Sequence, residues 1–198
     1  MRTVSVIDLR PQSAFNYSTD SFYREKPKQS LLLGYEKIIY LFFNWPLWLC
    51  KCVLLKAKLI LFKLPYDTCN MGKVTSKKNT KAHYTLYPLL EVFNVCGCMH
   101  TPPAVDLSRC VTFENSYRRS YTEIDVTQIV QDWSNDTLEN NGFLLMGKDN
   151  SPYIFYASSQ HRISEMRPML RLTCKYAERF CTLQTVPCDV KISKPVQV

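Results

Sequence analysis

The fold class follows most directly from one stretch, Pro168 to Tyr176, which reads PMLRLTCKY. Leu170, Leu172, Cys174 and Tyr176 recur at every second position, and the positions between them carry Arg, Thr and Lys. Alternate side chains of a β-strand point to opposite faces, so this pattern predicts a strand with one buried and one solvated face. We expect Leu170 and Leu172 to lie in the core.

The same alternation recurs upstream. A strand is predicted from Val53 to Leu64, with lysines on a solvated face, and its expected inward residues are Val53, Leu55, Ala57, Leu59 and Leu61. Further strands are predicted at residues 30–36, 36–44, 84–94 and 110–114. Many short strands with little helix predict an all-β antiparallel sandwich.

Two apolar runs in the second half of the chain suggest a hairpin. FLLM begins at Phe143 and YIFYA begins at Tyr153, and the turn-rich hexapeptide from Gly147 to Pro152 lies between them. Such a turn between two apolar runs predicts that they pair as an antiparallel hairpin.

One segment, Thr122 to Trp133, departs from the alternation. Its apolar residues fall at i, i+3, i+4 and i+7, namely Val126, Ile129, Val130 and Trp133. This spacing predicts a short helix near residues 127–133 whose apolar stripe faces the core. We expect Thr127 to be its N-cap and Trp133 to close the open end of the sandwich.

The composition is that of a folded, basic protein. Of the 198 residues, 46% are hydrophobic and 13% are aromatic, which argues against a disordered or collagen-like chain. Lys and Arg number 25 against 17 Asp and Glu, a net charge of +8. This excess indicates either an acidic partner or a solubilising surface. The glycines form neither GxGxxG nor GxxxxGK, so no glycine-built nucleotide site is expected.

The N-terminus, MRTVSVIDLRPQ, lacks the apolar core of a secretory signal. The longest uncharged run, Ile38 to Cys50, is interrupted by Asn44 and Pro46 and is shorter than the roughly 20 residues of a membrane span. We therefore expect no membrane span. The default location is the cytoplasm, with a cell or spore surface as the alternative.

The nine cysteines are too sparse for a small disulfide scaffold, so reduced thiols are the expected state. The cluster Cys96-Gly-Cys98-Met-His100 does not have the spacing of a structural zinc site and lacks a fourth ligand. We expect no cofactor; a structural metal ion is the alternative, although the sequence does not indicate one.

Four segments share a family pattern. IDVTQIVQDW, NNGFLLMG, FYASS and RPMLRLTCK resemble, in order and spacing, the C-terminal half of DNRLRE-type domains, which are related to disaggregatase repeats. SLLLGYE and IIYLFFNWPLWLCKCVLLKAKLILF resemble the first half more loosely, so the resemblance spans about residues 22–176. The chain departs from the pattern at Asn44, where the family usually carries Asp, and at Cys174.

The resemblance implies a jelly-roll-like β-sandwich. It also implies, by analogy with members attached to polysaccharide-active enzymes of bacteria, a noncatalytic carbohydrate-binding module. Residues 1–176 form a single domain in this interpretation, and residues 177–198 form a tail or extra strands.

The sequence gives little support for a set of catalytic residues. The acids Asp125, Asp132, Asp136 and Glu139 lie beside the predicted helix or in a polar loop, which does not favour a paired-carboxylate glycosidase. His161 and Arg162 are the local candidates for a glycan lyase, although a histidine in a loop is usually an exposed polar residue.

Binding needs less precise geometry than catalysis. Sugar recognition uses aromatic platforms with a few polar groups, and an acidic ligand also needs cations. The expected ligand-binding residues are Trp45, Trp48, Arg118, Arg119, Tyr153, Tyr156 and Arg162. Together with the lysine-rich run from Lys73 to Lys81, Arg118 and Arg119 form the densest basic clusters, and no nucleic-acid motif accompanies them.

The sequence thus favours noncatalytic recognition of a polysaccharide or cell-envelope polymer, with an acidic one expected from the charge. A structural or assembly subunit of a cell or spore surface layer is the main alternative, and a glycan lyase is a weaker one. Self-association of the chain is left open by the sequence.

Overall fold

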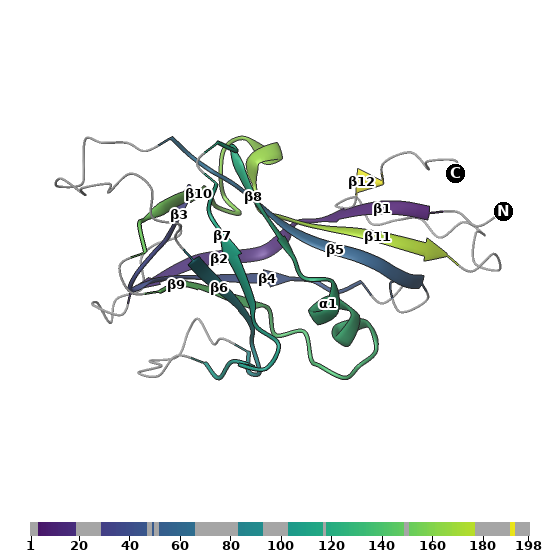
Figure 1. The fold of residues 1–198 in the computed structure, drawn as a ribbon. Coiled ribbons are helices and arrows are strands. Elements are labelled where there is room, and N and C mark those ends of the chain that lie inside the picture. Colours follow the sequence, from purple (N-terminus) through teal and green to yellow (C-terminus); the bar gives the residue numbers. More distant parts are fainter. Residues whose placement is uncertain are drawn as a thin grey trace.

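Two five-stranded antiparallel sheets pack against each other in the computed structural model (Figure 1). The structure describes residues 4–18, 29–46, 49, 52–65, 83–92, 103–116, 118–148, 151–176 and 191–192. The first sheet has the order β12 (Lys191–Ile192), β1 (Val4–Leu9), β11 (Met169–Tyr176), β5 (Cys52–Phe62) and β8 (Tyr121–Asp125). The second has the order β2 (Pro11–Ser18), β4 (Lys37–Phe43), β9 (Phe143–Gly147), β6 (His83–Pro88) and β7 (Val111–Glu114).

Four smaller elements complete the described fold. β3 (Ser30–Leu33) and β10 (Ile154–Ala157) form a separate two-stranded pair. The helix α1 (Thr127–Ser134) follows β8, and the 3-10 turn η2 (Ser164–Met166) precedes β11. The chain crosses repeatedly from one sheet to the other, as in jelly rolls, so the expected all-β antiparallel sandwich with one short helix is confirmed.

The core lies between the sheets, where each strand directs its alternate apolar residues. Leu170 and Leu172 of β11 are fully buried, as are the residues of the helical stripe, Val126, Ile129, Val130 and Trp133. Trp133 packs against Phe143 of the second sheet, with ring centroids 4.7 Å apart. The helix therefore closes one end of the sandwich.

The expected hairpin from Phe143 to Ala157 is wrong. β9 lies in the middle of the second sheet and pairs with β4 on one side and β6 on the other. Because both of its edges are occupied, β10 pairs instead with β3. The turn-rich hexapeptide thus connects strands of two different sheets rather than two strands that pair with each other.

The expected inward face of β5 is wrong in its first part. Val53 and Leu55 are exposed and Leu54 is buried, whereas Ala57, Leu59 and Leu61 are buried as expected. The register against β11 shifts between Thr173 and Cys174, because Thr173 pairs with Lys56 and Cys174 with Leu54. This β-bulge leaves Leu55 as an extra residue and inverts the alternation before it.

Thr127 is not the N-cap of α1. It is the first helical residue, and its hydroxyl contacts the backbone of Ala57 on β5. The Asp125 carboxylate instead accepts hydrogen bonds from both the N–H and the hydroxyl of Thr127. Within the described residues, no helix has the length and hydropathy that a membrane crossing needs.

Candidate functional site

One end of the first sheet gathers positive charge from segments that are far apart in the sequence. Leu9 pairs with Leu170, Met169 with Ile60, and Phe62 with Tyr121, so the end of β1, the start of β11, the end of β5 and the start of β8 lie together. We call this region the cationic end and define it by Arg10, Lys63, Arg118, Arg119, Arg162 and Arg167.

Lys63 fixes the loop that carries two of these arginines. Its backbone N–H donates to the carbonyl of Ser120 at 2.8 Å, and its Nζ donates to the carbonyls of Ser116 and Arg119. Partial burial, together with the nearby Arg119 charge, lowers the pKa of Lys63. Arg118 and Arg119 are exposed on this anchored loop.

Arg10 and Arg167 form the other half of the cationic end. Arg10 donates to the carbonyl of Arg167 at 2.6 Å, and Arg167 donates to the carbonyl of His161 at 2.9 Å, which places Arg162 beside them. Partial burial is the largest cause that lowers the pKa of Arg10, and the charges of Arg167 and Arg171 act in the same direction. The nearby carboxylates of Asp8 and Glu165 act in the opposite direction and raise the pKa of Arg10.

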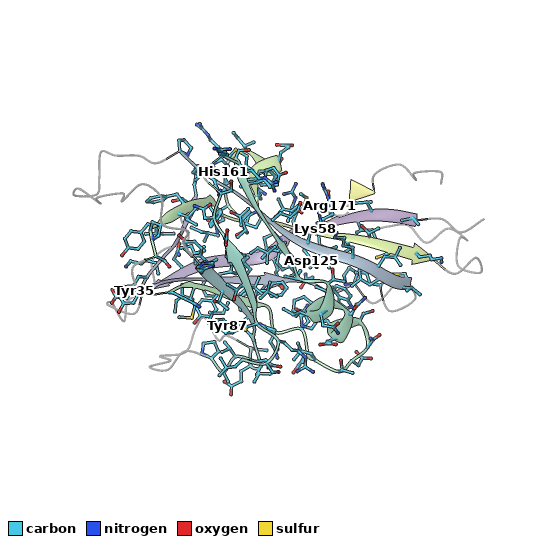
Figure 2. All side chains as sticks on the ribbon, viewed as in Figure 1. Tyr35, Lys58, Tyr87, Asp125, His161 and Arg171 are labelled. Atoms are coloured by element: carbon cyan, nitrogen blue, oxygen red, sulfur yellow. The ribbon has the colours of Figure 1, made fainter. Side chains whose placement is uncertain are left out.

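These hydrogen bonds do not neutralise the positive charge, although the carboxylates of Asp8 and Glu165 lie close to Arg10. Those of Arg10, Lys63 and Arg167 run to backbone carbonyls, which are neutral acceptors. The outer face of the same sheet is different, because Arg171 binds Asp8 with two hydrogen bonds of 2.8 and 3.0 Å, and Lys58 binds Glu123. Figure 2 shows Arg171, Lys58 and Asp125 in succession across this paired face.

His161 is buried rather than exposed, contrary to the expectation for a loop histidine. Only 7% of its surface is exposed, and its Nδ1 accepts the N–H of Ile163 at 3.2 Å. The backbone N–H of His161 donates to the carbonyl of Ser158 at 3.1 Å. The imidazole therefore shapes the turn that carries Arg162, and it does not lie open to a substrate as a lyase base would.

The aromatic residues expected to bind a ligand do not come together. Tyr156 is wrong as a surface platform, because it is fully buried in the core and its hydroxyl bonds to Thr122 at 2.8 Å. Tyr153 lies against Gly34, where its ring occupies the space that a Cβ would fill. Trp45 packs on Trp133 at the α1 end, and Trp48 lies outside the described residues. Of the expected set, only Arg118, Arg119 and Arg162 belong to the cationic end.

A separate cleft of about 440 Å³ lies between the loop before β7 and the start of α1. Arg109 at its edge binds both Asp106 and Asp132. Hydrogen bonds from Ser108, followed by those from Arg109, lower the pKa of Asp106 to about 2. Partial burial opposes a similar shift at Asp125, but hydrogen bonds from Thr127 lower its pKa. The charged groups around this cleft are thus paired with each other or hydrogen-bonded to neighbouring side chains.

The described residues contain no group of three or more potential metal-ligating side chains. The Cys96 to His100 cluster and the Lys73 to Lys81 run lie outside the described residues. No family model matches the chain, and no curated protein is found to be similar to it.

Sequence reasoning missed Arg10, Lys63 and Arg167. Each is isolated in the sequence, and only the strand register brings them together. A usable signal did exist, because Arg10 directly follows β1, Lys63 directly follows β5, and Arg167 lies just before β11. Cations at strand ends become informative once the pairing of those strands is known.

Proposed function

We propose that the protein recognises an acidic polysaccharide or cell-envelope polymer without catalysis, through the cationic end. The observation that carries this proposal is the convergence of Arg118, Arg119 and Arg162 with Arg10, Lys63 and Arg167, the last three of which donate hydrogen bonds to neutral backbone carbonyls. The resemblance to DNRLRE-type domains supports a carbohydrate ligand.

The chemistry of the site suits an anionic sugar. Arginine presents a planar fork of donors that matches a carboxylate, so exposed Arg118 and Arg119 would pair with uronate groups. Tyr121 is 36% exposed at the same end and lies against Phe62, with ring centroids 6.4 Å apart. An exposed aromatic edge beside cations offers a surface for the apolar face of a sugar ring.

The test compares two polymers that share one sugar backbone and differ in charge. Polygalacturonate carries free carboxylates, whereas its fully methyl-esterified form has the same backbone without them. We expect binding to polygalacturonate that weakens steeply between low and physiological salt, because exposed charges are screened beyond about 8 to 10 Å. Binding to the esterified polymer should be several-fold weaker at low salt.

A charge-matched pair of variants locates the site. Arg118→Ala with Arg119→Ala should weaken polygalacturonate binding several-fold, whereas Lys56→Ala with Lys148→Ala removes two exposed cations elsewhere and should leave it unchanged. Equal losses in the two double variants would show that net charge alone drives binding. Preference for duplex DNA over polygalacturonate at equal salt would replace the polysaccharide by a nucleic acid.

A further inference from the structure

Cys52 and Cys174 lie side by side on neighbouring strands, at the opposite end of the first sheet from the cations. Cys174 pairs with Leu54 and Cys52 pairs with Tyr176, so the two cysteines are diagonal neighbours across β5 and β11. Opposite residues of an antiparallel pair share a face, and Leu54 and Cys174 are both buried. Cys52 packs against the same core cluster.

The two thiols are close enough to influence each other's ionisation. The thiol of Cys52 donates to the carbonyl of Leu49 at 3.0 Å. Both cysteines are free thiols in the structure. The thiol of Cys52 is thus anchored to the backbone of Leu49, next to the buried Cys174 of the neighbouring strand.

The environments of the two thiols differ in a way that assigns them separate roles. Cys52 is partly exposed, whereas Cys174 is completely buried. The interaction with Cys174 lowers the pKa of Cys52, and the same interaction, together with burial, raises the pKa of Cys174. Because the thiolate is the nucleophile, Cys52 is the attacking thiol and Cys174 the resolving one.

From this geometry we propose that Cys52 and Cys174 form a redox-active dithiol, which a low-molecular-weight disulfide converts into a cross-strand disulfide between β5 and β11. The Cys52 thiolate attacks one sulfur of the small disulfide, which breaks its S–S bond and releases one thiol. Cys174 then gives up its proton and attacks the Cys52 sulfur, which releases the second thiol. Two protein thiols are oxidised and one small disulfide is reduced to two thiols.

The bulge beside the pair makes the disulfide reversible. Diagonal Cα atoms in a regular antiparallel sheet are about 7 to 8 Å apart, slightly more than the roughly 6.8 Å that a disulfide spans. The bulge at Leu55 adds local twist, so the closure requires only a small shift of the start of β5. A disulfide that needs such a shift is more easily reduced than an unstrained one.

Mass spectrometry of the whole protein tests this proposal. The reduced protein is equilibrated with mixtures of reduced and oxidised glutathione, blocked with an alkylating reagent and digested with trypsin. Cleavage after Lys51, Lys56, Arg171 and Lys175 releases residues 52–56 and 172–175. We expect these two peptides to appear linked, at a mass two hydrogens below their sum, and to separate on reduction.

Two variants make the result specific. Cys174→Ser should leave glutathione attached to Cys52, because the resolving thiol is missing, whereas Cys110→Ser changes an exposed thiol elsewhere and should keep the 52–174 link. The proposal is overturned if Cys52 joins another cysteine instead, or if both thiols are alkylated under conditions in which Cys110 already carries glutathione. Polygalacturonate affinity should change less than twofold on oxidation, because the pair lies at the far end of the sheet.

Discussion

Trp45 and Trp133 meet edge to face at the α1 end of the sandwich, with ring centroids 6.2 Å apart and ring planes at 74°. Trp133 continues the contact to Phe143 of the second sheet. Edge-to-face pairs contribute about 0.5 to 1.5 kcal/mol beyond the area they bury. Trp45 is therefore the outer member of an aromatic stack that closes the core, which is why its ring is engaged rather than free for a sugar.

Truncating Trp45 should reduce stability and spare ligand binding. We expect Trp45→Ala to lower the free energy of unfolding by about 3 kcal/mol, because it removes the ring that covers Trp133 and leaves a cavity. Urea denaturation measures this loss. Trp45→Phe keeps an aromatic edge on Trp133 and should cost less. If Trp45→Ala retains its stability and loses polygalacturonate binding, Trp45 is a ligand platform after all.

The buried pair of Tyr156 and Thr122 gives the protein a predicted sensitivity to alkali. Burial raises the pKa of Tyr156, although the hydrogen bond with Thr122 acts in the opposite direction. Above about pH 10 the unfolded chain releases this phenolic proton while the folded protein retains it. The contribution of Tyr156 to the free energy of unfolding is thus fully present below about pH 10 and falls as the pH rises further.

Tyr156→Phe should flatten the decline of unfolding free energy between about pH 10 and 11, measured by urea denaturation. At pH 7 the same variant should cost about 1 to 2 kcal/mol, because the Thr122 hydroxyl loses its partner in the core. Thr122→Val retains the buried phenol and should retain the alkaline decline. If the unfolding free energies of the wild type and Tyr156→Phe fall in the same way above about pH 10, Tyr156 is not the group that causes the alkaline decline.

Period-two alternation was enough to predict the sandwich, because one face of each strand must be buried whatever its partner. It could not identify those partners. The predicted pairing of β9 with β10 is therefore wrong, because β9 pairs with β4 on one side and β6 on the other. The alternation also gives the wrong inward residues before the bulge at Leu55. The extra residue there inverts which side chains face the core, and nothing in the residue types of this stretch indicates it.

The candidate site was only partly predictable for the same reason. Arg118 and Arg119 are adjacent in sequence and therefore visible, whereas Arg10 and Arg167 meet only through the register of β1 and β11. Tyr156 was misassigned because an aromatic residue in an alternating strand gives no sign of whether its hydroxyl has a buried partner.

Gly142 should resist substitution by alanine. Its φ is +94°, a conformation that side chains with a Cβ rarely adopt, and an added Cβ would lie 2.5 Å from the carbonyl oxygen of Leu41. Gly142→Ala is expected to lower the free energy of unfolding by about 2 kcal/mol. Lys148→Ala, at an exposed position just after β9, should change it by less than about 0.5 kcal/mol. Equal stability of the two variants would show that the chain adjusts freely here.

Asp106, in the loop before β7, should cause part of the loss of unfolding free energy at low pH. Asp106 accepts hydrogen bonds from the N–H and hydroxyl of Ser108 and from Arg109, and these bonds lower its pKa to about 2. An aspartate in the unfolded chain has a pKa of about 3.9, so the unfolded state takes up this proton first as the pH falls. The contribution of Asp106 is thus present above about pH 4 and is lost as the pH falls towards 2.

Two substitutions should alter this acid response to different degrees. Asp106→Asn removes the titrating group and should flatten the decline in unfolding free energy between about pH 4 and 2 the most. Arg109→Ala should flatten it only in part, because the bonds from Ser108, the largest cause of the shift, are retained. Urea denaturation at several pH values in this window measures the slopes of both variants and the wild type. Three parallel profiles would mean that Asp106 makes no favourable contact in solution, and a larger effect for Arg109→Ala would mean that the arginine, not Ser108, controls the carboxylate.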